Sequence, residues 1–162
     1  MEYRIECNSD DLMVHQDGVK IMDIKRRSDW WGIQTTRCWY HGELVLISTF
    51  DDSFWRIRMK IKYQHLQDQI QLTKSNGDYQ LICQDSFISI SRQYSQKPFF
   101  KIFVNGEEKA VVEHDGFAIG TIPFYWLRCK KEERVNFYIV IFFIMRLPTG
   151  LTFWYRIVPE AG

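Results

Sequence analysis

The segment from Val135 to Met145 limits the possible folds more than any other feature, because ten of its eleven side chains are apolar or aromatic. Only Asn136 is polar. The segment shows no alternation of polar and apolar side chains, so it must be buried on all sides or lie at a buried interface. A chain of 162 residues can enclose it, because a domain of this size buries roughly 70% of the surface exposed in the unfolded chain.

Two conformations of this segment are consistent with the sequence. As a helix, it would carry Glu132 and Glu133 in its first turn and Arg146 in its last turn, which suits the helix dipole, and Pro148 follows as a stop signal. As a strand, its β-branched and aromatic side chains fit better, and a turn would connect it to a second apolar run, Leu151 to Val158. We favour the helix.

The preceding part of the chain carries the pattern of antiparallel strands. The clearest run is Trp55 to Tyr63, in which apolar residues alternate with basic ones over nine residues. A period of two predicts a half-buried strand with one face in water. Shorter runs that we interpret in the same way are Gly18–Ile24, Trp31–Tyr40, Leu44–Phe50, Gln69–Leu72, Tyr79–Cys83, Phe87–Arg92, Phe99–Val104, Ala110–Glu113 and Ile122–Leu127.

Turn residues separate these runs. The pair Asn105-Gly106 predicts a type I′ hairpin turn, since both of its positions require a positive φ. Glycine follows another residue that suits a turn in Asp17-Gly18, His41-Gly42, Asn76-Gly77 and Asp115-Gly116. Turns at this spacing predict an antiparallel sheet rich in hairpins. A sheet this large usually closes or doubles, because open edges invite aggregation.

A mainly antiparallel chain that ends in one wholly apolar segment resembles the Tubby-like C-terminal fold, a group that includes plant LURP-one-related proteins and phospholipid scramblases. The resemblance rests on the strand-turn-strand run Phe99 to Glu107, on Asp115 to Ile119, and on Val135 to Met145. It implies a closed antiparallel barrel of about a dozen strands around one C-terminal hydrophobic helix. We therefore expect a single β-barrel domain over residues 1–162, with residues 135–145 at its centre.

An alternative fold replaces the central helix by a C-terminal hairpin. In such a lipocalin-like barrel or sandwich, Val135–Met145 and Leu151–Val158 would be strands that line a cavity for a small apolar ligand. The conformation of the first segment distinguishes the two folds, because a helix fills the barrel whereas strands leave a cavity open.

Charge and motifs favour a protein that acts by binding. Lys and Arg number 21 and Asp and Glu 20, a net charge of +1, so the chain lacks the basic excess of nucleic-acid-binding proteins. It contains no Gly-x-Ser-x-Gly motif, no phosphate-binding glycine-rich loop and no zinc-ligand spacing. We expect no nucleic-acid partner, metal or cofactor and no enzymatic activity, although a dispersed catalytic site would leave no such motif.

The cysteines point to a reducing compartment. Cys7, Cys38, Cys83 and Cys129 are spread widely, and the charged stretch Met1 to Asp11 has no apolar core like that of a signal peptide. We therefore expect reduced thiols and a cytoplasmic protein.

The alternating basic residues Arg56, Arg58, Lys60 and Lys62 form the first candidate site. On one strand face their charged groups would stand about 6.5 to 7 Å apart, a spacing that suits phosphates or an anionic lipid surface. The same alternation is also typical of a solvated face that protects a sheet edge.

A second candidate site combines Lys25, Arg26 and Arg27 with Trp30 and Trp31. A cationic loop beside two tryptophans can lie at a membrane interface or at an aromatic-lined ligand site, or it can be a turn with one tryptophan packed inward.

A third basic cluster, Arg128, Lys130 and Lys131, is followed directly by Glu132 and Glu133, which favours plain solvation.

These features predict a non-enzymatic binding module of Tubby-like type. Its partner would be an anionic membrane surface or an acidic protein, contacted from the cytoplasm, with a peripheral location at the membrane. Some Tubby-like domains bind phosphoinositides through basic side chains, so the resemblance agrees with this expectation without assigning residues.

Overall fold

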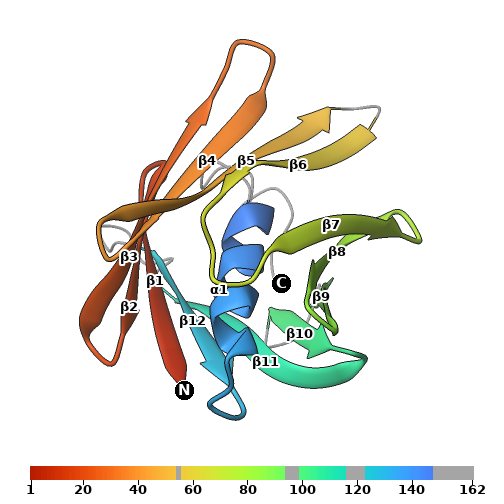
Figure 1. Cartoon of the computed structure of the whole chain (residues 1–162). Coiled ribbons are helices and arrows are strands. Elements are labelled where there is room, and N and C mark those ends of the chain that lie inside the picture. The colour runs from red at the N-terminus through yellow and green to blue at the C-terminus, as the bar shows by residue number, and fades with distance from the viewer. Residues whose placement is uncertain (54–55, 94–98, 116–122, 148–162) are drawn as a thin grey trace, which may run out of the picture.

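The computed structural model describes residues 1–53, 56–93, 99–115 and 123–147, which form twelve antiparallel strands and one helix (Figure 1). The elements are β1 (Glu2–Asn8), β2 (Asp11–Gln16), β3 (Val19–Ser28), β4 (Ile33–Tyr40), β5 (Glu43–Ser53), β6 (Arg56–Gln64), β7 (Ile70–Ser75), β8 (Asp78–Cys83), β9 (Ser86–Arg92), β10 (Phe100–Val104), β11 (Glu107–Asp115), β12 (Phe124–Cys129) and α1 (Val135–Arg146).

All twelve strands belong to one sheet, in the order β6-β5-β4-β3-β2-β1-β12-β11-β10-β9-β8-β7. Each half of the chain is therefore a six-stranded meander, in which every strand pairs with its sequence neighbour. The pairing of β1 with β12 joins the two meanders. The sheet curls into a nearly closed barrel with α1 inside it (Figure 1), which confirms the predicted fold class.

The gap of the nearly closed barrel lies between β6 and β7, the two ends of the sheet order. The side-chain amide of Gln64 connects the two strands. Its Oε1 accepts a hydrogen bond from the backbone N–H of Ile70 at 2.8 Å, and its Nε2 donates to the carbonyl of Ile70 at 3.0 Å. The amide thus makes the same two hydrogen bonds with Ile70 that a backbone peptide group of a neighbouring strand would make.

The predicted turns explain most of the strand boundaries. Asn105 and Gly106 have φ angles of 53° and 82°, as a type I′ turn requires. The prediction for this hairpin is confirmed. The pairs that begin at Asp17, His41 and Asn76 also have two positive φ angles each. The predicted turn at Gly116 lies outside the described residues.

Strands β1 and β2 were not among the predicted runs. Tyr3, Ile5 and Cys7 do alternate with polar residues, and all three are buried. The turn that follows contains no glycine, and Ser9 takes the positive φ of 59° in its place. Asn8, Ser9 and Asp10 all suit a turn, but without a glycine they mark the end of the first strand only weakly.

Helix α1 fills the barrel, and every residue from Tyr138 to Met145 is at most 3% exposed. This confirms the helix and shows that the alternative with a strand at residues 135–145 is wrong. Phe143 meets the rings of Phe100 and Tyr125 edge to face, at centroid distances of 5.4 and 5.5 Å. The proposed partner strand, Leu151–Val158, lies outside the described residues.

The helix begins later than its acidic residues suggested. Its first residue is Val135, so Glu132 and Glu133 precede it and its first turn contains no acid. Asn136 explains this start, since its N–H bonds the carbonyl of Glu133 at 3.0 Å and its side-chain amide bonds the carbonyl of Lys131 at 2.8 Å. These bonds hold the residues that precede the helix in a turn. They also give the one polar side chain of the segment a hydrogen-bond partner.

All four cysteines are free and buried. Burial raises the pKa of Cys7 and Cys129 from 9.0 to about 11, and that of Cys38 to about 12. The folded protein therefore keeps these thiols protonated at pH values where an unfolded chain ionises them.

Replacing Phe143 by alanine should lower the free energy of unfolding by about 3 to 5 kcal/mol, because the cavity would lie at the centre of the barrel. Chemical denaturation measures the change. Phe87, which is 49% exposed on β9, provides the control, and its replacement by alanine should change the stability by about 0.5 kcal/mol or less. Equal losses in the two variants would contradict the central position of α1.

The buried thiols predict a loss of stability at alkaline pH. Between pH 9.0 and the folded-state pKa values of about 11 to 12, the unfolded chain releases thiol protons that the folded chain retains. The free energy of unfolding should therefore fall as the pH rises through this range. Urea denaturation in the presence of a reductant measures it, and Cys129→Ala should show a shallower fall. A flat profile would contradict the burial of the thiols.

Candidate anion-binding site

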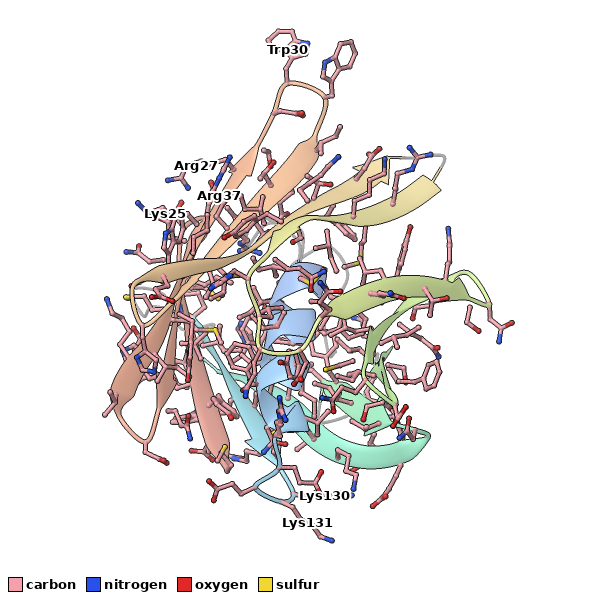
Figure 2. The ribbon with its side chains drawn as sticks, in the orientation of Figure 1. Lys25, Arg27, Trp30, Arg37, Lys130 and Lys131 are labelled. Atoms are coloured by element: carbon pink, nitrogen blue, oxygen red, sulfur yellow. The ribbon has the colours of Figure 1, made fainter. Side chains whose placement is uncertain are left out.

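Strand parity places Lys25 and Arg27 on the outer face of β3, where both are exposed. The residues that alternate with them, Met22, Ile24 and Arg26, are buried inside the barrel. Arg37 of β4 lies directly opposite Lys25 and is also exposed. The β3–β4 hairpin thus carries three basic side chains on its outer surface, which Figure 2 shows along the hairpin.

Strand β6 adds further basic residues to the same side of the sheet. Lys60 lies opposite Thr49, and Arg58 lies opposite Asp51. Lys62 is exposed at a register shift in the pairing of β5 with β6. This shift breaks the predicted alternation, so that Tyr63 is 43% exposed and does not continue the inward face.

The structure describes only part of the run of basic residues predicted for β6. Arg56 is the first residue of β6, where its backbone lies opposite Ser53. The side chain of Arg56 and the whole of Trp55 lie outside the part of the chain that the structure describes.

We call this outer surface of β3–β6 the basic face, defined by its described side chains Lys25, Arg27, Arg37, Arg58, Lys60 and Lys62. The pairing register connects its two halves. Arg27 lies opposite Thr35, Thr35 opposite Thr49, and Thr49 opposite Lys60. At about 4.8 Å per strand, this row spans roughly 14 Å. The structure therefore brings the two predicted basic sites together on one continuous surface.

Among the described side chains, most cations of the basic face form no ion pair. Arg37, Arg58, Lys60 and Lys62 have none, although Asp51 lies opposite Arg58 in the strand pairing. The side chain of Lys25 lies 5.7 Å from the ring centre of Trp39. The exception is Arg27, whose Nη1 lies 2.8 Å from Oδ1 of Asp11 while its side chain stays 60% exposed. The face is thus locally positive although the whole chain has a net charge of only +1.

The third basic cluster differs in this respect. Arg128 pairs with Glu2 at 2.6 Å and with Glu113 at 3.3 Å, and Lys130 pairs with Glu108 at 3.1 Å. Lys130 and the adjacent Lys131 lie at the opposite end of the molecule from the β3–β4 hairpin (Figure 2). Two of the three cations of this cluster are thus paired with acids, although the partners are Glu2, Glu108 and Glu113 and not the adjacent Glu132 and Glu133.

Arg26 does not belong to the predicted cationic loop. Residues 25–27 lie within β3, and Arg26 points into the barrel, where it is 3% exposed. Its Nη1 donates to the carbonyl of Leu147 at 2.9 Å, and its Nε donates to the carbonyl of Asp10 at 3.1 Å. Burial lowers the pKa of this guanidinium, and the nearby Cys7 acts against that shift.

The carboxyl end of α1 explains why Arg26 lies inside the barrel. The last carbonyl groups of a helix have no partner within the helix and attract positive charge. Gln34 of β4 also donates to the carbonyl of Leu147, at 3.2 Å. Arg26 and Gln34 thus attach the carboxyl end of the helix to the barrel wall, and Arg26 is not available to a ligand.

Arg37 is the basic residue of this face that was not predicted. It stands between Thr36 and Cys38, without the basic neighbours that drew attention to Lys25 and Arg27. The pairing of Ser28 with Gln34 centres the turn on Trp31, and counting outward from that residue places Arg37 opposite Lys25.

A second polar cluster lies at the start of α1. The buried carboxylate of Asp68 accepts hydrogen bonds from Arg134 at 2.7 Å, from Gln84 at 2.7 Å and from the hydroxyl of Tyr138 at 2.9 Å. Burial raises the pKa of Tyr138 from 10.0 to about 12, so that the hydroxyl keeps its proton even at pH values where an exposed tyrosine ionises. These contacts fix the first turn of the helix against the β6–β7 and β8–β9 connections.

A pocket of about 370 Å³ opens beside this cluster. Its charged side chains are already paired, Asp68 with Arg134, and Lys109 with Glu107 at 3.3 Å and Glu133 at 3.7 Å. The pocket therefore presents no free charge to a ligand, and we assign the cluster a structural role.

Residues 1–53, 56–93, 99–115 and 123–147 contain neither a metal-binding cluster nor a membrane-spanning helix. No group of three or more His, Cys, Asp or Glu side chains is placed to hold a metal ion. No helix there has the length and apolar character needed to cross a membrane.

Comparisons of the chain with protein-family models, with curated proteins and with solved structures give no match.

The two ends of α1 offer a matched test of buried and exposed ion pairs. Asp68→Ala should cost about 2 kcal/mol or more, because it leaves the buried hydroxyl of Tyr138 without its acceptor. Asp78 pairs with Arg146 at the other end, and its side chain is 55% exposed, so Asp78→Ala should cost less than about 1 kcal/mol. Thermal or urea unfolding measures both. The account of the cluster fails if the two variants lose equal stability.

Proposed function

We propose that the protein is a non-enzymatic binding module of Tubby-like type that binds anionic lipid headgroups through the basic face. It would act as a peripheral protein at the cytoplasmic side of a membrane, the leaflet that carries most anionic lipid. The observation that supports this function is the set of cations on the outer surface of β3–β6 that have no ion-pair partner among the described side chains.

The filled interior of the barrel favours an external ligand. Residues 138–145 occupy the space where a carrier protein would hold an apolar molecule. The carrier function depended on strands at residues 135–145, so the helix removes its structural basis. Twelve antiparallel strands around one buried C-terminal helix also agree with the architecture that the Tubby-like resemblance implies.

The shape of the basic face favours a membrane over a small anion. Its charges are spread over three strands, β3, β4 and β6, on the outside of a barrel, a surface that does not surround a ligand. Long Lys and Arg side chains on such a surface can each reach a different phosphate of a lipid layer. Arginine can bind a phosphate through two parallel hydrogen bonds, and lysine acts as a point charge.

Vesicle binding tests the proposal. The protein should bind vesicles of phosphatidylcholine mixed with phosphatidylserine, should not bind phosphatidylcholine alone to the same extent, and should lose affinity as salt increases. The triple variant Arg37→Gln, Lys60→Gln and Lys62→Gln should bind roughly a hundredfold more weakly, at about 1 kcal/mol for each charge near the surface. Co-sedimentation with vesicles gives these affinities.

The third basic cluster provides a control of the same composition. The variant Arg128→Gln, Lys130→Gln and Lys131→Gln removes the same charge from the opposite end of the molecule and should bind like the wild type. Equal losses in both variants would mean that only net charge matters. Equal binding of the wild type to neutral and anionic vesicles would refute lipid-headgroup recognition and leave an acidic protein as the partner to test.

A further inference from the structure

The β3–β4 hairpin ends in two exposed tryptophans. Trp30 is 93% exposed and Trp31 is 81% exposed. Figure 2 shows Trp30 at the outer end of the hairpin, beyond the rest of the barrel. Neither indole makes a ring or cation contact with a described side chain. Such exposure is unfavourable, because burying an aromatic side chain would remove about 150 to 250 Å² of its surface from water.

The turn that carries the indoles is held by Asp29. One carboxylate oxygen, Oδ1, accepts hydrogen bonds from the N–H of Trp31 and from the N–H of Ile33, both at 2.9 Å. The backbone of Asp29 also bonds Gly32 at 3.1 Å and Ile33 at 2.9 Å. Gly32 supplies the positive φ of 80° that closes the hairpin.

These bonds do not require tryptophan. The two central positions of such a turn accept most residues, and polar side chains would be better solvated there. The indoles therefore add nothing to the formation of the turn in the described contacts. The hairpin nevertheless holds them in a fixed position, so that little backbone entropy is lost when they bind a partner.

Basic residues lie directly behind the tryptophans on the same hairpin. Arg27 is three residues from Trp30, about 10 Å along the strand, and Lys25 and Arg37 follow on the same outer face. The interfacial region of each lipid leaflet is about 5 to 8 Å thick. With the indoles in that region, the backbone of Arg27 lies just outside it, and its long side chain can reach the lipid phosphates.

We propose that the end of the β3–β4 hairpin inserts Trp30 and Trp31 into the interfacial region of an anionic phospholipid bilayer. The proposal rests on the proposed function, because the basic face supplies the attraction that selects an anionic surface. Tryptophan is enriched at this depth of membranes, where the ring contacts apolar chains and its N–H stays near polar groups. The electrostatic attraction and the insertion of the indoles then both contribute to binding. Salt screens the attraction but not the insertion.

Tryptophan fluorescence in vesicles with brominated acyl chains tests the insertion. Bromine quenches an indole only at short range. The vesicles contain phosphatidylserine and brominated phosphatidylcholine, at low salt and in lipid excess, so that both wild type and variant are bound. The wild type should be quenched, and the double variant Trp30→Ala and Trp31→Ala should lose that quenching although four tryptophans remain in the chain.

Affinity provides the second readout. The double variant should bind anionic vesicles about tenfold or more weakly than the wild type, and the difference should persist at high salt. Phe87→Ala, which removes an exposed aromatic side chain from β9, should bind and be quenched like the wild type. Circular dichroism should show the same fold for all three proteins.

The outcomes separate the two proposals. Salt-sensitive binding to anionic vesicles without quenching, and with the double variant binding like the wild type, would overturn the insertion and leave the basic face intact. The absence of any preference for anionic vesicles would overturn the proposed function and, with it, the choice of a bilayer as partner. Self-association that the double variant abolishes, with no quenching by vesicles, would show that the indoles contact a second copy and would overturn the insertion.

Discussion

The burial of an apolar helix inside a curved sheet is the constraint on which the rest of this structure depends. Residues 138–145 of α1 are apolar or aromatic on every side and at most 3% exposed, so the helix requires a wall around its whole circumference. A flat sheet would cover only one side of it. The two meanders therefore curl around the helix, and the β1–β12 pairing and the Gln64 contact to Ile70 join their ends.

The two ends of the helix also determine where several buried polar side chains lie. Its carboxyl end is bonded by Arg26 and Gln34 from inside the barrel, and its amino end is held by Asp68 through Arg134 and Tyr138. These groups are occupied by the fold itself. With the interior filled and the polar groups at both ends of α1 bonded, the surfaces left for recognition are outside. Among the described residues, the outer face of β3–β6 carries the most cations that form no ion pair.

The sequence predicted those features that depend on local patterns. Alternation and paired turn residues located ten of the twelve strands, and the apolar composition of residues 135–145 located the helix. Arg26 shows how a local pattern was misread. It shares strand parity with Met22 and Ile24, which marks it as inward, yet its basic neighbours suggested a cationic loop. The identity of the charge it meets, a helix end 121 positions away in the sequence, is a property of the fold.

Other parts of the site depend on contacts between distant segments. The register shift at Lys62 redirects Tyr63 toward water, and nothing within β6 announces it. Asp68 stands in a polar stretch without periodicity, and its role arises only when α1 brings Arg134 and Tyr138 to it. The ion pairs of Arg128 and Lys130, which separate the neutralised cluster from the basic face, likewise join residues of different strands.

The most direct test of the enclosed helix is a backbone nuclear magnetic resonance measurement over residues 135–146. The account predicts helical Cα and Cβ chemical shifts throughout. It also predicts that the amide hydrogens of residues 139–145 exchange only through global unfolding, because no local opening exposes them. Extended-strand shifts, or exchange as fast as that of a surface helix, would contradict it.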